Sequence, residues 1–140
     1  MSLHEPAARE AREPRMMLDA AYVGQLQALA AAAIDRAPEV ADRLQDDLER
    51  AIVLPSLEMP PGVVNIGSEV VCRDEVSGRE QILVLVLPVA ADISAGRVSV
   101  VTPMGAALIG LSEGSCVTWA ARDGASRRLR IMRVRRAELP

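Results

Sequence analysis

Apolar side chains recur at helical spacing over two stretches near the start of the chain, 16–34 and 39–54. Within each stretch they follow one another every three or four positions, which lines them up on one helical face. The first stripe comprises Leu18, Tyr22, Leu26, Leu29 and Ala33, and the second comprises Val40, Leu44, Leu48, Ala51 and Ile52. Ala37-Pro38 separates them, because the residue before a proline is pushed out of the helical region and proline suits a first helical turn. The pattern predicts two helices that fold back on each other as a short antiparallel hairpin, a short coiled coil.

The period of the apolar positions changes after the proline-rich segment 55–62. Shorter runs rich in β-branched residues follow, which is typical of strands. The predicted strands are 66–74, 79–87, 97–102, 115–121 and 127–135. Ser77-Gly78 and Asp123-Gly124 stand between successive runs and predict hairpin turns, because both dipeptides allow positive φ. The second half of the chain is therefore predicted to form a twisted, mainly antiparallel five-stranded sheet.

One further helix is predicted inside this half of the chain. A proline opens the segment 103–110 and a glycine closes it, which favours a single short helix between the third and fourth strands. The fold class is therefore α+β. We expect a disordered leader at 1–15, the helical hairpin at 16–54, a prolyl linker at 55–62 and a second domain at 63–140.

The side-chain inventory removes several classes of function. All 16 basic residues are Arg, and the one histidine, His4, stands in the leader. Lysine Schiff bases, histidine general bases and histidine metal clusters are therefore not expected. Trp119 and Tyr22 are the only aromatic residues, which excludes a pocket walled by several rings. We expect a non-enzymatic protein with no catalytic residue, no cofactor, no metal ion and no small-molecule substrate.

Charge and cysteine usage narrow the expected partners and location. The net charge is -3, so the chain lacks the basic excess that drives binding to duplex nucleic acid. Cys72 and Cys116 stand far apart in apolar runs, which predicts free thiols in a reducing compartment. The apolar runs are too short to span a bilayer, and the N-terminal segment has no apolar signal region. We expect a cytoplasmic protein without a membrane partner or a sequence-specific nucleic-acid partner.

The stretch from Ser99 to Gly114 is the most specific in the sequence. A serine is followed after two residues by Thr102-Pro103, a hydrophobic residue, a small residue, a Leu-Leu-like pair and a glycine turn. This order resembles the signature of the C-terminal domain of the bacterial transcript-cleavage factors GreA and GreB. Thr102 replaces a serine of that signature and Ser115 replaces an acid. The hydroxyl of Thr102 is still suited to cap the short helix.

The flanking segments make the resemblance narrower. Segments 58–60, 63–68, 85–88 and 103–110 are similar to the regulator of nucleoside diphosphate kinase (Rnk) family, and the similarity covers about residues 44–135. The resemblance implies a short N-terminal helical hairpin and a C-terminal domain of FKBP-like fold. It also implies binding to RNA polymerase at the rim of the secondary channel, in competition with the cleavage factors.

Two segments are the candidate polymerase contacts. The first is the loop-to-helix junction Thr102-Pro103-Met104-Gly105, where Met104 is suited to adaptable apolar recognition. The second is the preceding loop, Asp92-Ile93-Ser94. Binding by occupancy needs no chemistry at either segment. A prolyl isomerase is not expected, because its pocket would need several aromatic side chains and Trp119 is predicted to pack in the core.

The turn between the two helices carries three acids, Asp35, Glu39 and Asp42. One alternative is a transcript-cleavage or elongation factor that delivers such carboxylates to a catalytic Mg²⁺. Reach argues against it, because a second helix of about 16 residues is only about 24 Å long at 1.5 Å per residue. Acids in a first helical turn also favourably oppose the helix dipole. A further alternative is a protein-interaction module without a polymerase connection.

The predicted last strand is rich in arginine. Arg128 and Arg130 are candidates for a basic contact, since guanidinium groups bind phosphates or carboxylates. The apolar alternation slips between Ile131 and Met132, which predicts a β-bulge or a sheet edge. Charged edge strands ordinarily protect against aggregation. No aromatic side chains interleave for base stacking, so nucleic-acid recognition is not favoured.

Overall fold

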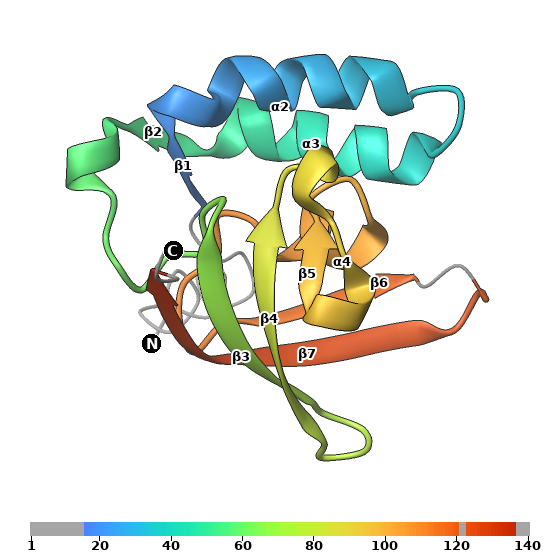
Figure 1. Cartoon of the computed structure of the whole chain (residues 1–140). Coiled ribbons are helices and arrows are strands. Elements are labelled where there is room, and N and C mark those ends of the chain that lie inside the picture. Colours follow the sequence, from blue (N-terminus) through green and yellow to red (C-terminus); the bar gives the residue numbers. More distant parts are fainter. Residues whose placement is uncertain (1–15, 121–122, 137–140) are drawn as a thin grey trace, which may run out of the picture.

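A computed structural model describes residues 16–120 and 123–136. The predicted leader, 1–15, lies outside the described residues. Two helices, α2 (Ala20–Ala33) and α3 (Pro38–Arg50), lie along each other in Figure 1, joined by a short turn. Pro38 occupies the first turn of α3, where its missing N–H is not needed. Both helices coincide closely with the stretches that have helical spacing, but each is shorter than its stretch.

Both helices are shorter because the ends of the two stretches form a small parallel sheet. Strand β1 (Met17–Asp19) pairs with strand β2 (Ile52–Leu54), so the prediction of helix at 16–19 and 52–54 was wrong. Asp19 is extended, and its carboxylate accepts the backbone N–H of Ala21 at 2.9 Å. Asp19 therefore caps α2, which begins at the next residue. Ile52 and Val53 are β-branched, and Leu54 directly precedes Pro55; both features favour the extended conformation.

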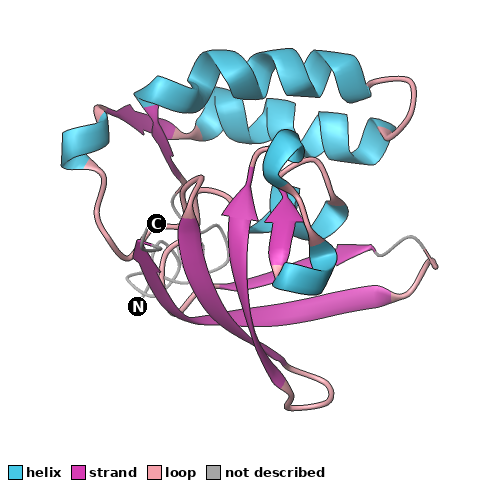
Figure 2. Ribbon diagram, in the orientation of Figure 1, coloured by secondary structure: helices cyan, strands magenta, loops and turns pink. Residues whose placement is uncertain are grey.

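The second half of the chain contains a curled five-stranded mixed sheet (Figure 2). Its strands are β3 (Ser68–Asp74), β4 (Glu80–Val86), β5 (Arg97–Ser99), β6 (Cys116–Ala120) and β7 (Ser126–Arg136), in the order β5-β4-β3-β7-β6. All neighbours are antiparallel except β4 and β5, which are parallel. Gly78 and Gly124 both have positive φ in the turns that join the antiparallel pairs, as predicted.

Strand β7 contains a bulge and lies inside the sheet. Val71 of β3 pairs with Arg133, whereas the next residue, Cys72, pairs with Ile131. Met132 is therefore the extra residue, which confirms the predicted slip as a bulge. The edge alternative was wrong, because β7 pairs with β3 on one side and with β6 on the other. Protection of an exposed edge therefore does not explain the arginines of β7.

One core joins the helices to the sheet. Helix α4 (Pro103–Leu108) lies between α3 and the sheet, and α3 packs on α4 (Figure 1). Side chains from both long helices share a single buried cluster with those of α4 and the strands. Its members from the two long helices are Leu26, Ala30, Val40 and Leu44, and its fully buried strand members include Leu85, Ile131, Val70 and Cys72. Three short 3₁₀ turns, η1 (Ser56–Glu58), η2 (Pro88–Ala90) and η3 (Ile93–Ala95), complete the described elements.

The base of the helices is fixed by the buried carboxylate of Asp19. Besides capping α2, it accepts the hydroxyl of Ser56 at 2.6 Å and the side-chain amide of Asn65 at 2.9 Å. Burial by itself would raise the pKa of Asp19, but these hydrogen bonds outweigh it and leave the pKa below its ordinary value. Asp19 thus ties the entry of α2 to the segment that follows β2. None of the helices in the described residues is long and apolar enough to cross a membrane.

Candidate functional site

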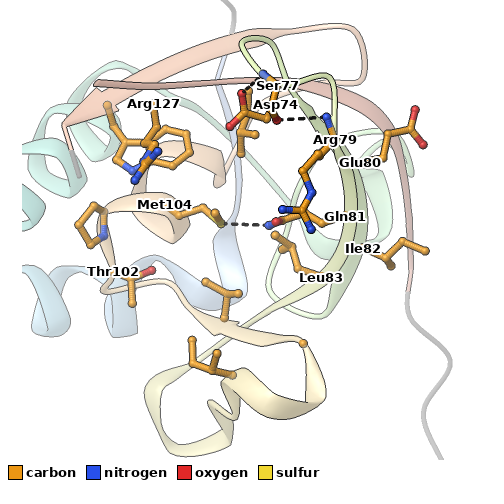
Figure 3. A pocket seen from close by; sticks show the side chains of 16 residues that line it. Asp74, Ser77, Arg79, Glu80, Gln81, Ile82, Leu83, Thr102, Met104 and Arg127 are labelled. Carbon is orange, nitrogen blue, oxygen red and sulfur yellow. Dashed lines mark hydrogen bonds between the residues drawn. The ribbon is translucent and has the colours of Figure 1, made fainter. Parts of the chain in front are cut away.

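A cavity of about 850 Å³ opens at one corner of the sheet. It lies between the β3–β4 turn, η3 and the start of α4, and we call it the corner groove (Figure 3). Four of the predicted contact residues line it: Ile93, Thr102, Pro103 and Met104. The two predicted segments, ten residues apart in sequence, therefore border one concave surface.

The start of α4 is held against the sheet by Thr102 and Gly105. The Thr102 hydroxyl donates to the carbonyl of Ser99 at 2.7 Å and accepts the backbone N–H of Gly105 at 3.0 Å. The threonine thus caps α4 as predicted. A Cβ at Gly105 would collide with the carbonyl oxygen of Ser99 and lie 2.8 Å from the Cα of Val100. Gly105 is buried, so it supports the groove by permitting close packing and does not line it.

The loop before β5 presents Ile93 to solvent. Asp92 accepts the hydroxyl of Ser94 at 2.7 Å and pairs with Arg97 at 3.5 Å. The Ser94 hydrogen bond is the main reason that the pKa of Asp92 lies below its ordinary value. The Ile93 side chain is 77% exposed. Asp92 and Ser94 thus shape the loop, while Ile93 is the side chain that borders the corner groove.

The floor and walls of the groove are mainly apolar. Leu83, Val98, Leu129 and Trp119 line it from four different strands. Trp119 is only 9% exposed and belongs to the core, as predicted. Sequence reasoning missed the contribution of β4, whose strand alternation marks Leu83 as an inward residue but does not indicate a cavity beside it.

Gln81 also reaches the groove from β4. Its side-chain amide lies 3.9 Å from the sulfur of Met104, and the two side chains point toward one another in Figure 3. Ile82, the next residue along β4, is 62% exposed and points away from the groove in Figure 3. Met104 is half-buried, so it is accessible from the groove while its backbone is fixed in α4. The groove therefore offers accessible apolar side chains on a rigid frame.

The polar border of the groove lies at the β3–β4 turn. Asp74 accepts the backbone N–H groups of Ser77 at 3.0 Å and Val76 at 2.8 Å, and these bonds lower its pKa. Arg127, opposite Trp119 on β7, pairs with Asp123 at 3.2 Å. Arg79 follows the turn and its side chain extends toward Gln81 and Met104 in Figure 3. This end of the groove therefore carries charged groups of both signs, and Arg79 is the one guanidinium among its lining residues without a carboxylate partner in the described residues.

The three acids near the helical turn lie away from the groove. Asp35, Glu39 and Asp42 are all exposed, and none of them lines the cavity. No group of three His, Cys, Asp or Glu side chains suited to a metal ion occurs in residues 16–120 and 123–136. One contact ties this end of the hairpin to the sheet: Arg43 donates to the carbonyl of Thr118 at 3.3 Å.

Arg128 and Arg130 alternate with the inward-facing Leu129 and so lie on the outer face of β7. Arg130 pairs with Glu75 and reaches the carbonyl of Gly114, both at 3.4 Å. Arg128 is exposed opposite Thr118. Neither residue lines the corner groove.

The two cysteines are free, as expected. Cys72 is fully buried and burial raises the pKa of its thiol to about 11, so it packs as a small apolar residue. Cys116 is half-buried, with its sulfur 3.9 Å from the carboxylate of Glu75.

Comparison with known sequences identifies relatives of the chain. The family model described as "Transcription elongation factor, GreA/GreB, C-term" matches residues 59–136. The regulator of nucleoside diphosphate kinase of Escherichia coli K12 is 34% identical over 93 residues, which cover 66% of this chain and 68% of that protein. The transcription elongation factor GreA of Azorhizobium caulinodans is 35% identical over 92 residues, which cover 66% of this chain and 58% of that protein.

A solved structure matches nearly the whole described fold. The prokaryotic transcription elongation factor GreA/GreB from Nitrosomonas europaea superposes with a TM-score of 0.71 and 33% sequence identity. The match covers 88% of this chain and 99% of that one. The similarity therefore includes the N-terminal part of the chain, which the family model does not reach.

Proposed function

The chain belongs to the family of the GreA/GreB C-terminal domain and of the regulator of nucleoside diphosphate kinase, and we propose that it regulates transcription by binding RNA polymerase through the corner groove. In this proposal it occupies the entrance of the secondary channel and competes there with transcript-cleavage factors. It acts in the cytoplasm, without catalysis of its own.

The observation that carries this proposal is the exposure of apolar side chains around a preformed groove. Ile93 is largely exposed and Met104 is accessible, while Thr102 and Gly105 hold the backbone of α4 beneath Met104. Accessible apolar residues on a rigid concave frame are typical of protein-binding sites. Ile93 and Met104 belong to the two segments that the sequence analysis predicted as polymerase contacts.

The lengths of the helices support blocking of the channel entrance over delivery of carboxylates to a metal ion inside it. Helices α2 and α3 have 14 and 13 residues, which correspond to about 20 Å each at 1.5 Å per residue. Helix α3 packs on α4, and Arg43 contacts the carbonyl of Thr118. The helices therefore add bulk beside the groove and do not project from it as a free arm.

The alternative of a cleavage factor has less support. It would need Asp35, Glu39 or Asp42 to reach a metal ion inside the channel, and these acids lie at the end of a short pair of helices. The same proposal includes an FKBP-like fold for the sheet domain and a short coiled coil for the two helices. Prolyl isomerisation is not part of it, because Trp119 is the one aromatic residue that lines the groove.

Competition on stalled transcription complexes tests the proposal. Purified chain is added to core polymerase with backtracked RNA, and cleavage by added GreA is followed over time. We expect the chain to bind the polymerase and to slow GreA-dependent cleavage in proportion to its occupancy. Stimulation of cleavage by the chain alone would favour the cleavage-factor alternative. Failure to bind polymerase would reject both functions.

A further inference from the structure

One charge in the corner groove has no partner within the described part of the chain. Arg79 lines the groove and is exposed, and it forms no ion pair or side-chain hydrogen bond with the described residues. Its side chain extends along the groove toward Gln81 and Met104 (Figure 3). The guanidinium therefore lies beside the apolar surface that the proposed function assigns to polymerase.

The acids close to Arg79 are all engaged elsewhere. Asp74 accepts two backbone N–H groups of its own turn. Glu80, on the outer face of β4, pairs with Arg73 at 3.0 Å. Asp123 pairs with Arg127 at 3.2 Å. None of these acids thus forms a hydrogen bond or an ion pair with the Arg79 guanidinium.

A partner that covers the groove must remove water from Arg79. Burying an unpaired charge is costly, whereas a carboxylate on the partner would form a charge-assisted pair with the guanidinium. The neighbouring wall, with Leu83, Val98 and Met104, requires apolar side chains at the same time. The groove therefore selects a polypeptide surface on which an acid lies next to an apolar residue.

We propose that the polymerase segment that enters the corner groove presents a carboxylate beside an apolar side chain, and that Arg79 pairs with this carboxylate and sets specificity for it. The inference rests on the proposed function and names the chemistry of its partner. Arg79 belongs to neither of the two segments that the sequence analysis predicted as polymerase contacts.

Charge reversal at two arginines tests the inference. Arg79→Glu and Arg133→Glu change the net charge equally, and Arg133 is exposed on the outer face of β7, away from the groove. Affinity of each full-length variant for core polymerase is measured at several salt concentrations. We expect Arg79→Glu to weaken binding at least tenfold and to flatten its salt dependence, and Arg133→Glu to weaken it less than threefold. Arg79→Lys should retain most of the affinity.

Arg79→Gln provides a second variant if Arg79→Glu does not fold, and we expect it to weaken binding about fivefold. Equal weakening by Arg79→Glu and Arg133→Glu would indicate that the overall charge of the protein controls binding, not a local ion pair at Arg79, and would overturn the inference. Unchanged binding of Arg79→Glu and Arg79→Gln, together with loss of binding on Met104→Glu, would overturn the inference while leaving the proposed function intact. Absence of polymerase binding by the wild-type chain would reject the proposed function and this inference with it.

Discussion

The corner groove and the acidic turn between α2 and α3 are both sites that the sequence singles out, and they differ in how their side chains are held. Met104 and Ile93 sit on backbone fixed by Thr102, Gly105 and the Asp92 loop. The acids of the turn, including Asp35, extend into solvent. Binding energy depends on side chains that are already ordered, since ordering them costs entropy. The comparison indicates that the groove is the better candidate for recognition.

The largest effect is expected at Gly105. Gly105→Ala would place a Cβ against the carbonyl of Ser99 and should displace α4, at a cost of about 1–3 kcal/mol in the free energy of unfolding. Gly24→Ala is the matched control, because nothing lies within 4 Å of its Cβ position in α2. The control should stabilise the protein by about 0.5–1 kcal/mol. Urea unfolding measures both, and equal effects of the two variants would contradict the role given to Gly105.

The groove and the turn should differ strongly in polymerase affinity. Met104→Glu and Ile93→Asp place charges in the apolar border of the groove and should each weaken binding at least tenfold, about 1.4 kcal/mol. The triple variant Asp35→Asn, Glu39→Gln, Asp42→Asn should bind within about twofold of wild type, because these exposed side chains carry no contact. Equilibrium binding to core polymerase measures the difference. Weaker binding by the triple variant than by the groove variants would assign polymerase binding to the turn.

The helices should respond to pH through Asp47 of α3. This carboxyl group is 4% exposed and one of its oxygens has no hydrogen-bond partner. Burial, partly opposed by Arg43 and Arg50, raises its pKa from 3.8 to about 7. The folded state therefore holds a proton that the unfolded state releases, and stability should fall as pH rises from about 4 to about 7.

Asp47→Asn should remove most of this pH dependence. Near pH 7 it should stabilise the fold on the order of 1 kcal/mol, because an amide avoids burying a charge. Thermal unfolding from pH 4 to 8 measures the change. Asp19 provides an internal contrast: its pKa is lowered, so its contribution is lost only as pH falls through and below about 4. A wild-type stability that rises between pH 5 and 7 would contradict the assignment to Asp47.

The smallest effect is expected on the outer face of β7. Arg128→Glu and Arg130→Glu should change polymerase affinity less than threefold, since neither side chain lines the groove. Arg130→Glu should also lower stability by less than about 1 kcal/mol, because its pair with Glu75 is partly exposed. The same binding assay decides, and a tenfold loss at Arg128 would extend the interface beyond the groove.

The sequence predicted the sheet better than the ends of the helices. Most strand positions and the slip at Met132 follow from local alternation, which the pleat of a strand imposes directly, and both turns follow from their glycines. The strand predicted at 97–102 was too long, because β5 ends at Ser99 and the chain then turns into α4, which Thr102 caps. Strands β1 and β2 were missed because Leu18 and Ile52 satisfy helical spacing equally well. Their extended state depends on pairing between segments more than thirty residues apart, which no local pattern contains.

The site was predicted in part for a similar reason. Thr102 and Pro103 are typical of a capped helix start, so the side of the groove that α4 forms could be predicted from the sequence. Gln81, Leu83 and Arg79 form the opposite side, and as strand and turn residues they carry no sign of what they face. Only the curl of the sheet brings them next to Met104.

The parallel pairing of β1 with β2 has a consequence for how such proteins vary. The pairing joins the segment before α2 to the segment after α3, and Asp19 connects this small sheet to the following loop through its hydrogen bond with Asn65. Equal numbers of whole turns can therefore be added at the far ends of α2 and α3 without disturbing this attachment. The length of the two helices and the strength of their attachment at β1 and β2 are therefore separate properties, and one can change without the other.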